Sequence, residues 1–245
     1  MLLEKLRYIK TGAIFIAMFM LGSCTNLDEV WYNKVTSTTF FKSKEDVEAA
    51  LYRPFTHARW YEVNDRWRLQ ECSADHFIYT QKGKHWYNGG VNHRFLHHEW
   101  TPDDGWIWDT WRGTTMGIAL AIDTKLDLEQ VDYSSFALTE QDKADHVNQL
   151  NALIGYFYLR GLDFFGPFVI FVDPEKPVEG RSTDKKVFAH AEQIFKEAIP
   201  LLKAKEEGQK EEGAIRKAGA AAMLARLYFM PEKTVMLMLP RFVRT

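Results

Sequence analysis

The fold of this chain is decided by the stretch Leu153-Ile-Gly-Tyr-Phe-Tyr-Leu-Arg-Gly-Leu-Asp-Phe-Phe-Gly-Pro167. It closes a longer segment in which apolar residues recur at helical spacing, namely at Val147, Leu150, Ile154, Phe157, Tyr158 and Leu162. Thr139-Glu-Gln-Asp142 has capping spacing at the start of the segment, and Gly166-Pro167 is a helix stop at its end. The pattern predicts one long helix between these signals, with one face buried.

Four more helices are predicted on either side of this one. Before it, we expect a helix over 44–59, capped by Ser43-Lys-Glu-Asp46 and kinked or ended early by Pro54, and a second over 106–125 with a face of Trp111, Thr115, Ile118 and Ile122. After it, we expect a helix over 185–203, bent at Pro200, and one over 214–230 that is rich in small residues. The extended piece 168–172 is a candidate for a lone strand.

Together these elements predict an all-α fold in which helices are joined by long aromatic loops. The last two predicted helices recur at roughly the 34-residue period of tetratricopeptide units, which suggests an α-solenoid segment. With 46% hydrophobic residues, the 245-residue chain is neither disordered nor fibrous. Its 31 basic and 33 acidic residues give a net charge of −2, so we expect no nucleic-acid partner.

The N-terminus has the pattern of an export signal. A basic head is followed by an apolar run from Gly12 to Leu21, which is shorter than the roughly 20 residues that span a bilayer. Leu21-Gly-Ser-Cys24 then resembles the bacterial lipoprotein box, in which Cys24 is acylated, as with palmitate, and becomes the first mature residue. A buried helix followed by a free buried cysteine is the alternative interpretation.

The two cysteines of the chain, Cys24 and Cys72, exclude a disulfide framework. If Cys24 is acylated, Cys72 has no partner and is expected to be a small buried apolar residue. Several acyl chains on one cysteine would hold the protein stably at a membrane, whereas a single chain binds only marginally.

Several motifs follow the lipoprotein box in order: Phe40-Phe41 before a capped helix, Cys72-Ser-Ala-Asp75, a Trp-rich stretch before a helix at Trp111, the stretch Leu153–Pro167, and Ile215-Arg-Lys-Ala-Gly-Ala-Ala-Ala-Met-Leu-Ala-Arg-Leu-Tyr228. In this combination the chain resembles the SusD/RagB family of outer-membrane nutrient-binding lipoproteins, over about residues 24–229. The resemblance implies a signal peptide over 1–23 and a SusD-like N-terminal helical domain over 24–230.

The chain departs from the family pattern in two places. Ile122-Asp123 stands where the family usually has an asparagine, so helix contacts there are expected to differ. Family members are also commonly about twice as long, and the atypical tail over 231–245 does not resemble their continuation. We therefore expect an incomplete domain from a truncated or frame-shifted gene.

The resemblance implies a binding protein rather than an enzyme. Such a protein is anchored in the outer membrane, faces the cell surface, and passes glycans or other oligomeric nutrients to a TonB-dependent, SusC-like transporter. The alternatives are a secreted α-helical glycoside hydrolase and a fragment with only a partner-docking role. No cofactor is expected in any of these cases.

The chemistry of a glycan site is concentrated in one third of the chain, which holds seven of the eight tryptophans. Sugars present apolar C–H faces and hydroxyl rims, so a flat ring beside amide or carboxylate groups suits them. The candidate ligand-binding residues are Asp75, Trp86, Tyr87, Asn88 and Trp100, with Gly89-Gly90 marking an exposed loop. Each tryptophan is alternatively a core residue, as we expect for Trp108 and Trp111, and Asp75 is alternatively a cap.

Catalytic and metal-binding patterns are weak. His93 and His97 have the i, i+4 spacing of a chelate, but no HExxH motif or cysteine pair completes a site, so no metal is expected. Asp103 and Asp104 are adjacent and cannot by themselves flank a glycosidic bond, which needs carboxyl groups about 5–9 Å apart on opposing elements. No catalytic residue is assigned.

Overall fold

The computed structural model describes residues 40–171, 176–178, 180–206 and 213–230. The candidate signal peptide, Cys24 and the tail over 231–245 lie outside these residues. The α-helices of the described part are α3 (Lys44–Tyr61), α4 (Trp67–Ser73), α5 (Val91–Leu96), α6 (Gly105–Gln130), α7 (Glu140–Phe165), α8 (Asp184–Ala198) and α9 (Lys217–Phe229). A π-helical turn, η1 (Glu62–Arg66), joins α3 to α4.

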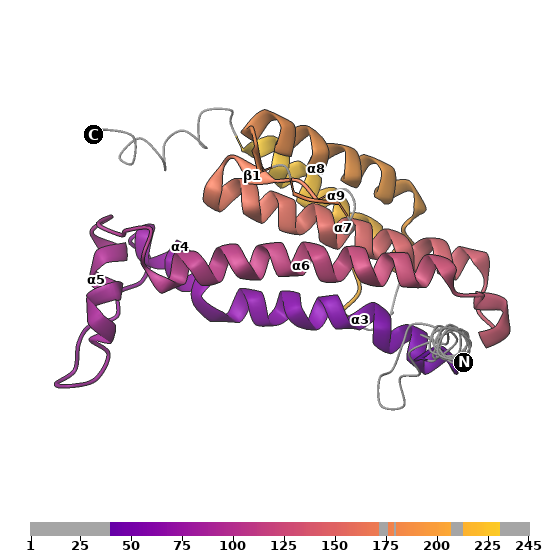
Figure 1. Cartoon of the computed structure of the whole chain (residues 1–245), viewed down its shortest axis with the longest axis horizontal. Helices are drawn as coiled ribbons and strands as arrows, with labels where there is room; N and C mark the ends of the chain where they lie inside the picture. Colours follow the sequence, from indigo (N-terminus) through magenta and orange to yellow (C-terminus); the bar gives the residue numbers. More distant parts are fainter. Residues whose placement is uncertain (1–39, 172–175, 179, 207–212, 231–245) are drawn as a thin grey trace, which may run out of the picture. The chain divides into compact units, whose positions relative to one another are not determined.

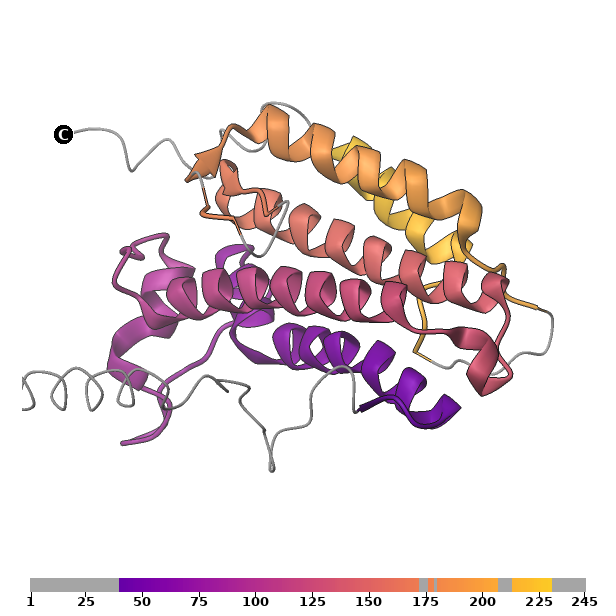
Figure 2. The same cartoon turned by 45° about the vertical axis from the view of Figure 1, so that its right-hand side comes forward.

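The long helices pack on one another in the order in which they occur in the sequence (Figures 1 and 2). Helix α6 packs between α3 and α7, α8 packs on α7, and α9 packs on α8. The short turn η3 (Tyr133–Phe136) reverses the chain between α6 and α7. Consecutive helices that contact mainly their neighbours are typical of solenoids, and the expectation of an all-α, tetratricopeptide-like fold is confirmed.

Helix α7 begins and ends where the sequence predicts. The Thr139 hydroxyl accepts a hydrogen bond from the Asp142 amide at 3.1 Å, and the Asp142 carboxylate accepts one from the Thr139 amide at 2.8 Å. These bonds satisfy two backbone donors that a helix start leaves unpaired. At the other end, the Gly166 amide donates to the Leu162 carbonyl at 2.9 Å with φ +66° at Gly166. Most of the predicted stripe is core: Ile154, Phe157, Tyr158 and Leu162 lie in the main cluster and Leu150 lies in a second one, whereas Val147 is only partly buried.

Aromatic rings that enter glycine notches set the spacing between the helices. A Cβ atom on Gly117 of α6 would lie 2.3 Å from the Phe157 ring of α7, and one on Gly155 of α7 would lie 2.9 Å from the Phe195 ring of α8. Real Cβ atoms do not approach other atoms so closely, so each ring occupies the space that glycine leaves. The pairs Gly113–Tyr61 and Gly161–Phe168 repeat this arrangement at 2.9 Å.

Several predicted boundaries differ from the structure. Pro54 lies inside α3 and does not end it, whereas at Ile199–Leu201, around Pro200, the chain leaves α8 in a 3-10 turn, η4. Helix α9 begins at Lys217, three residues later than predicted. The extended piece is not a lone strand, because β1 (Phe168–Val169) pairs antiparallel with β2 (Arg181–Ser182).

The buried face of α6 also differs from the prediction. Trp108 was expected in the core but is 61% exposed. The buried stripe of α6 follows its small residues, including Thr110, Gly113 and Gly117, because neighbouring rings enter there. Trp108 precedes Thr110 by two residues, which is about 200° around the helix, and so it faces solvent. Trp111 is partly buried against the main core, as expected.

Cys72 is fully buried beside Val91 and Phe95, and this burial raises the pKa of its thiol. The expectation of a small buried apolar residue is confirmed. Within the described ranges, no helix combines the length and apolar character needed to cross a membrane.

Replacing Gly117 with alanine tests the notch that receives Phe157. We expect Gly117→Ala to lower the free energy of unfolding by about 1–3 kcal/mol in urea titrations, because the ring must shift to admit the methyl group. Gly219→Ala in α9 is the matched control, because its Cβ would meet no atom within 4 Å. The control should be neutral or gain up to about 1 kcal/mol from helix propensity. Equal stability of the two variants would contradict the notch.

Candidate functional site

The aromatic segment that precedes α6 contains two short helices, α4 and α5, that the sequence did not predict. Helix α4 ends at Asp75, which has the left-handed backbone of a Schellman motif with φ +58°. The His76 amide donates to the Glu71 carbonyl at 3.1 Å, and the Asp75 amide donates to the Cys72 carbonyl at 3.4 Å. Asp75 therefore ends the helix through its backbone, while its exposed side chain makes no hydrogen bond within the described ranges.

Helix α5 ends in the same way at His98, which has φ +56°. The Glu99 amide donates to the Arg94 carbonyl at 2.7 Å, which closes the motif. The His98 Nε2–H donates to the Ser73 carbonyl at 2.8 Å, because a carbonyl can only accept. This bond connects the C-terminal end of α5 to that of α4.

An ion pair between Arg94 of α5 and Asp104 fixes the segment to the start of α6. The Arg94 Nε lies 3.1 and 3.2 Å from the two Asp104 oxygens, and Nη2 also donates to Oδ1. Asp104 is 5% exposed and accepts a further bond from the Thr101 amide at 2.8 Å. The Arg94 Nη1 donates to the Gly89 carbonyl at 2.8 Å. We call this arrangement the Arg94–Asp104 clamp; its hydrogen bonds from Arg94 lower the pKa of Asp104.

An inner layer of rings lies beneath the segment. Phe95 is buried and stacks on both Trp100, at 5.5 Å and 17° between planes, and Trp106, at 5.1 Å and 21°. Trp100 is partly buried against the cluster that includes Cys72. These contacts favour the core interpretation for Trp100, one of the candidate ligand-binding residues.

A second, outer layer of rings consists of the exposed Phe77 and Trp86 and the partly buried Trp67 and Tyr79. We call these four rings the aromatic platform. Trp86 is 50% exposed and stacks on Tyr79 with 5.5 Å between centroids and 20° between planes. Tyr79 meets Phe77 edge-on at 4.9 Å, and Phe77 meets Trp67 edge-on at 5.5 Å. Tyr87, next to Trp86, is similarly exposed.

Trp86 occupies a backbone conformation that bulky residues rarely adopt. Its φ is +67°, in the left-handed region, which costs a residue with a side chain about 1–2 kcal/mol. The buried Asn92 side chain holds this turn by donating from Nδ2 to the Trp86 carbonyl at 3.1 Å. After Tyr87, which is right-handed with φ −65°, Asn88 and Gly89 are again left-handed, with φ +46° and +63°. A strained, exposed tryptophan held by a buried amide is a reason to look for a function.

The platform is also connected to the helix that decides the fold. Arg160 of α7 is buried, and its Nη1 donates to the Gln70 Oε1 of α4 at 3.2 Å. Its Nε lies 3.3 Å from the Glu62 carboxylate on the π-helical turn η1, and the Tyr156 hydroxyl donates to the same carboxylate. These contacts hold α4, which carries Trp67, against α7.

The structure therefore brings together only part of the predicted site. Trp86, Tyr87 and Asn88 share one exposed turn, Asp75 ends α4, and Trp100 belongs to the inner layer. Tyr79 was not predicted from the sequence, although the alternation Phe77-Ile-Tyr79 is a signal for rings on one side of an extended segment. The His93 and His97 rings stack at 6.3 Å, and the described ranges contain no group of three or more potential metal ligands.

The Arg94–Asp104 clamp should make stability depend on pH. Because the folded-state pKa of Asp104 is lowered, the clamp stabilises the fold above the ordinary aspartate pKa of about 3.9, and that contribution is lost as pH falls through the folded-state value. We expect Asp104→Asn to destabilise the protein at pH 7, by urea unfolding, with the gap to the original protein narrowing toward pH 3. Asp103→Asn, at the exposed neighbour, should have little effect. A gap that is independent of pH would contradict the role of the clamp.

Comparisons with known proteins place this geometry in a known fold. No family model matches the sequence, and no curated protein matches it. Among solved structures, one described as a laminarin-binding SusD-like protein is similar with a TM-score of 0.64 and 20% identity, covering 77% of this chain and 40% of that one. A SusD-like protein from Bacteroides fragilis has a TM-score of 0.60 and 18% identity, and the match covers 82% of this chain and 38% of that one.

A surface glycan-binding protein A from Bacteroides uniformis is also similar, with a TM-score of 0.60 and 16% identity, covering 76% of this chain and 41% of its own. The chain thus spans about two fifths of the length of these structures. At such identities the likeness concerns the fold, and it agrees with the resemblance that the sequence motifs indicate. The described part of this chain has the SusD-like fold.

Proposed function

We propose that this chain is a member of the SusD/RagB family and a carbohydrate-binding protein of the cell surface, whose aromatic platform contacts the sugar. The observation that carries the proposal is Trp86, half-exposed, stacked on Tyr79 and held with a left-handed backbone. Glycine would adopt this left-handed backbone at a lower free-energy cost than tryptophan. We therefore take the indole ring to be the reason for a tryptophan at this position.

The groups around the platform suit a sugar. The ring of Trp86 offers an apolar face to the C–H groups of a pyranose, and its indole N–H is a donor for a hydroxyl. The neighbouring Asn88 amide both donates and accepts, and the Tyr87 hydroxyl does the same. A neutral polyhydroxylated ligand can use all of these groups, and the Arg68 guanidinium, 5.7 Å from the centre of the Tyr79 ring, adds donors for hydroxyl groups at the other side of the platform.

Two of the similar structures support this ligand class. Their descriptions name laminarin binding and surface glycan binding, respectively. The Trp-rich segment of this chain is the part whose chemistry fits such ligands. Laminarin is accordingly the first polysaccharide to test here, within a panel of neutral glycans.

Anchoring and delivery complete the proposal. Acylation of Cys24 would tether the domain to the outer leaflet of the outer membrane, and a TonB-dependent, SusC-like transporter would receive the captured glycan. The lipoprotein box and the SusD-like motifs support these two steps. The proposed role is binding rather than catalysis. In keeping with it, Asp104, one of the two adjacent acidic residues considered for catalysis, is engaged in the clamp with Arg94.

The platform is tested with affinity electrophoresis of the Cys24→Ala protein in gels that contain laminarin or other neutral polysaccharides. We expect retardation by at least one polysaccharide, and Trp86→Gly should weaken that affinity at least about tenfold, or 1.4 kcal/mol. Glycine removes the ring but relieves the strained backbone, so this variant should be at least as stable as its parent.

The matched control is Phe229→Ala, which removes an aromatic side chain that is 86% exposed on α9. It should leave retardation unchanged. Absence of retardation by every polysaccharide, or full retention of affinity in Trp86→Gly, would contradict the proposed site. Release of reducing sugars from the same panel would instead support the hydrolase alternative.

The anchor has a separate test. We expect Cys24→Ser to move the protein from the detergent-extracted membrane fraction to the soluble fraction, with little change in helical circular dichroism, because the candidate anchor precedes the helical domain in the sequence. Cys72→Ser, at the buried cysteine, should not release the protein. Unchanged membrane association of the Cys24→Ser variant would place the anchor elsewhere.

A further inference from the structure

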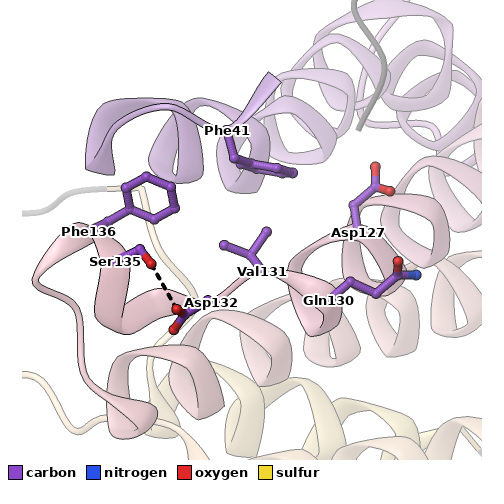
Figure 3. Close-up of a pocket in the computed structure, with 7 residues that line it drawn as sticks. All are labelled: Phe41, Asp127, Gln130, Val131, Asp132, Ser135 and Phe136. Carbon is purple, nitrogen blue, oxygen red and sulfur yellow. Dashed lines mark hydrogen bonds between the residues drawn. The ribbon is translucent and has the colours of Figure 1, made fainter. Parts of the chain in front are cut away.

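A pocket of about 280 Å³ lies at the end of α6 farthest from the aromatic platform (Figure 3). Asp127 and Gln130 come from the last turns of α6, Phe41 precedes α3, and Ser135 and Phe136 belong to the turn η3. About 21 residues of α6 separate Asp127 from Trp106, which belongs to the inner layer of rings on the platform side, and this corresponds to roughly 30 Å. The pocket is therefore distinct from the platform.

The centre of the pocket is apolar. Figure 3 shows the rings of Phe41 and Phe136 on different sides, with the Val131 side chain between them. The two rings come from separate elements and are held by the hydrophobic cluster that also contains Val47, Leu128 and Val131. Two fixed aromatic surfaces of this kind can receive the apolar faces of a ring-shaped ligand.

The rim of the pocket is polar, and only some of its polar side chains make hydrogen bonds within the described ranges. The Asp132 carboxylate accepts from the Ser134 amide at 3.1 Å and from the Ser134 and Ser135 hydroxyls at 2.6 and 2.8 Å. By contrast, the side chains of Asp127 and Gln130 make no hydrogen bond within the described part of the chain. They leave carboxylate acceptors and an amide that both donates and accepts facing the pocket.

The charged residues that line the pocket indicate which charge a ligand can carry. The lining includes two carboxylates but no lysine, arginine or histidine, which disfavours an anion. An ammonium group would match the carboxylates but would leave the donors of the Gln130 amide unused. Hydroxyl groups can donate to Asp127 and accept from Gln130 together, so a neutral polyhydroxylated ring uses the whole rim.

We infer that this pocket is a second carbohydrate-binding site, separate from the platform and sized for one or two sugar rings. Its volume lies just below the usual range of about 300–1,000 Å³ for small-molecule sites, which fits a short segment of a glycan. The inference takes its ligand class from the proposed function, but its geometry is independent of Trp86. A polysaccharide would then contact the domain at both ends of α6.

The test compares variants by isothermal titration with the panel polysaccharide that retards the Cys24→Ala protein most. In the Trp86→Gly background we expect residual binding, and adding Asp127→Ala with Gln130→Ala should weaken it at least about tenfold. These two side chains lie on the rim and not in the core, so folding should persist. Glu129→Ala, an exposed neighbour outside the pocket, is the matched control and should have no effect.

Each outcome has a distinct meaning. Loss of all binding in Trp86→Gly alone would support the platform as the sugar site and overturn the second site. Residual binding that the rim variants do not change would also overturn it. Failure of the parent protein to bind any panel member would overturn the proposed function and the second site together. Rim-dependent binding of tetramethylammonium in place of the sugar would assign the pocket to cations and overturn the inference.

Discussion

The rest of the structure depends on the ring of Phe157, which enters the notch that Gly117 leaves on α6. The same ring meets Tyr61 edge-on at 5.5 Å and lies 6.0 Å from the His57 ring, so one side chain joins α3, α6 and α7. Burying such a ring contributes roughly 1.5–3 kcal/mol. Its position also fixes the interaxial distance, because a side chain larger than hydrogen at residue 117 would separate the helices. Gly155 and Phe195 repeat the constraint between α7 and α8.

Polar contacts hold the candidate site against this helical frame. Arg160 on α7 holds Gln70 of α4, and the Arg94–Asp104 clamp holds α5 and the turn of Trp86 against α6. The strained backbone of Trp86 is tolerated because these contacts hold the neighbouring chain in place on several sides. The platform is thus an exposed, preorganised surface on a rigid support, and preorganisation reduces the entropy that a ligand loses on binding. Buried polar contacts, together with the apolar cluster that includes Cys72, Phe95 and Trp106, connect the core to the site.

The long helices could be predicted because their signals are local. Ser43 and Thr139 cap their helices as the sequence indicates, and Gly166 ends α7. Helices α4 and α5 were missed because they are short and end at Asp75 and His98 without the glycine that usually marks such ends. The exposure of Trp108 was missed because the buried face of α6 consists of small residues, whose burial depends on rings from other helices. The stacking of Tyr79 on Trp86 likewise depends on tertiary structure.

The candidate site was predictable in its chemistry but not in its arrangement. The crowding of tryptophans and the glycine pair at residues 89 and 90 located the exposed turn, while only the structure separates the outer Trp86 from the inner Trp100. The most direct measurement of the central claim is a crystal structure of the Cys24→Ala protein with an oligosaccharide from a polysaccharide that it binds. We expect a pyranose ring stacked on the exposed face of Trp86, with hydroxyls bonded to Asn88 or Tyr87. A sugar bound elsewhere, with Trp86 uncovered, would contradict the account.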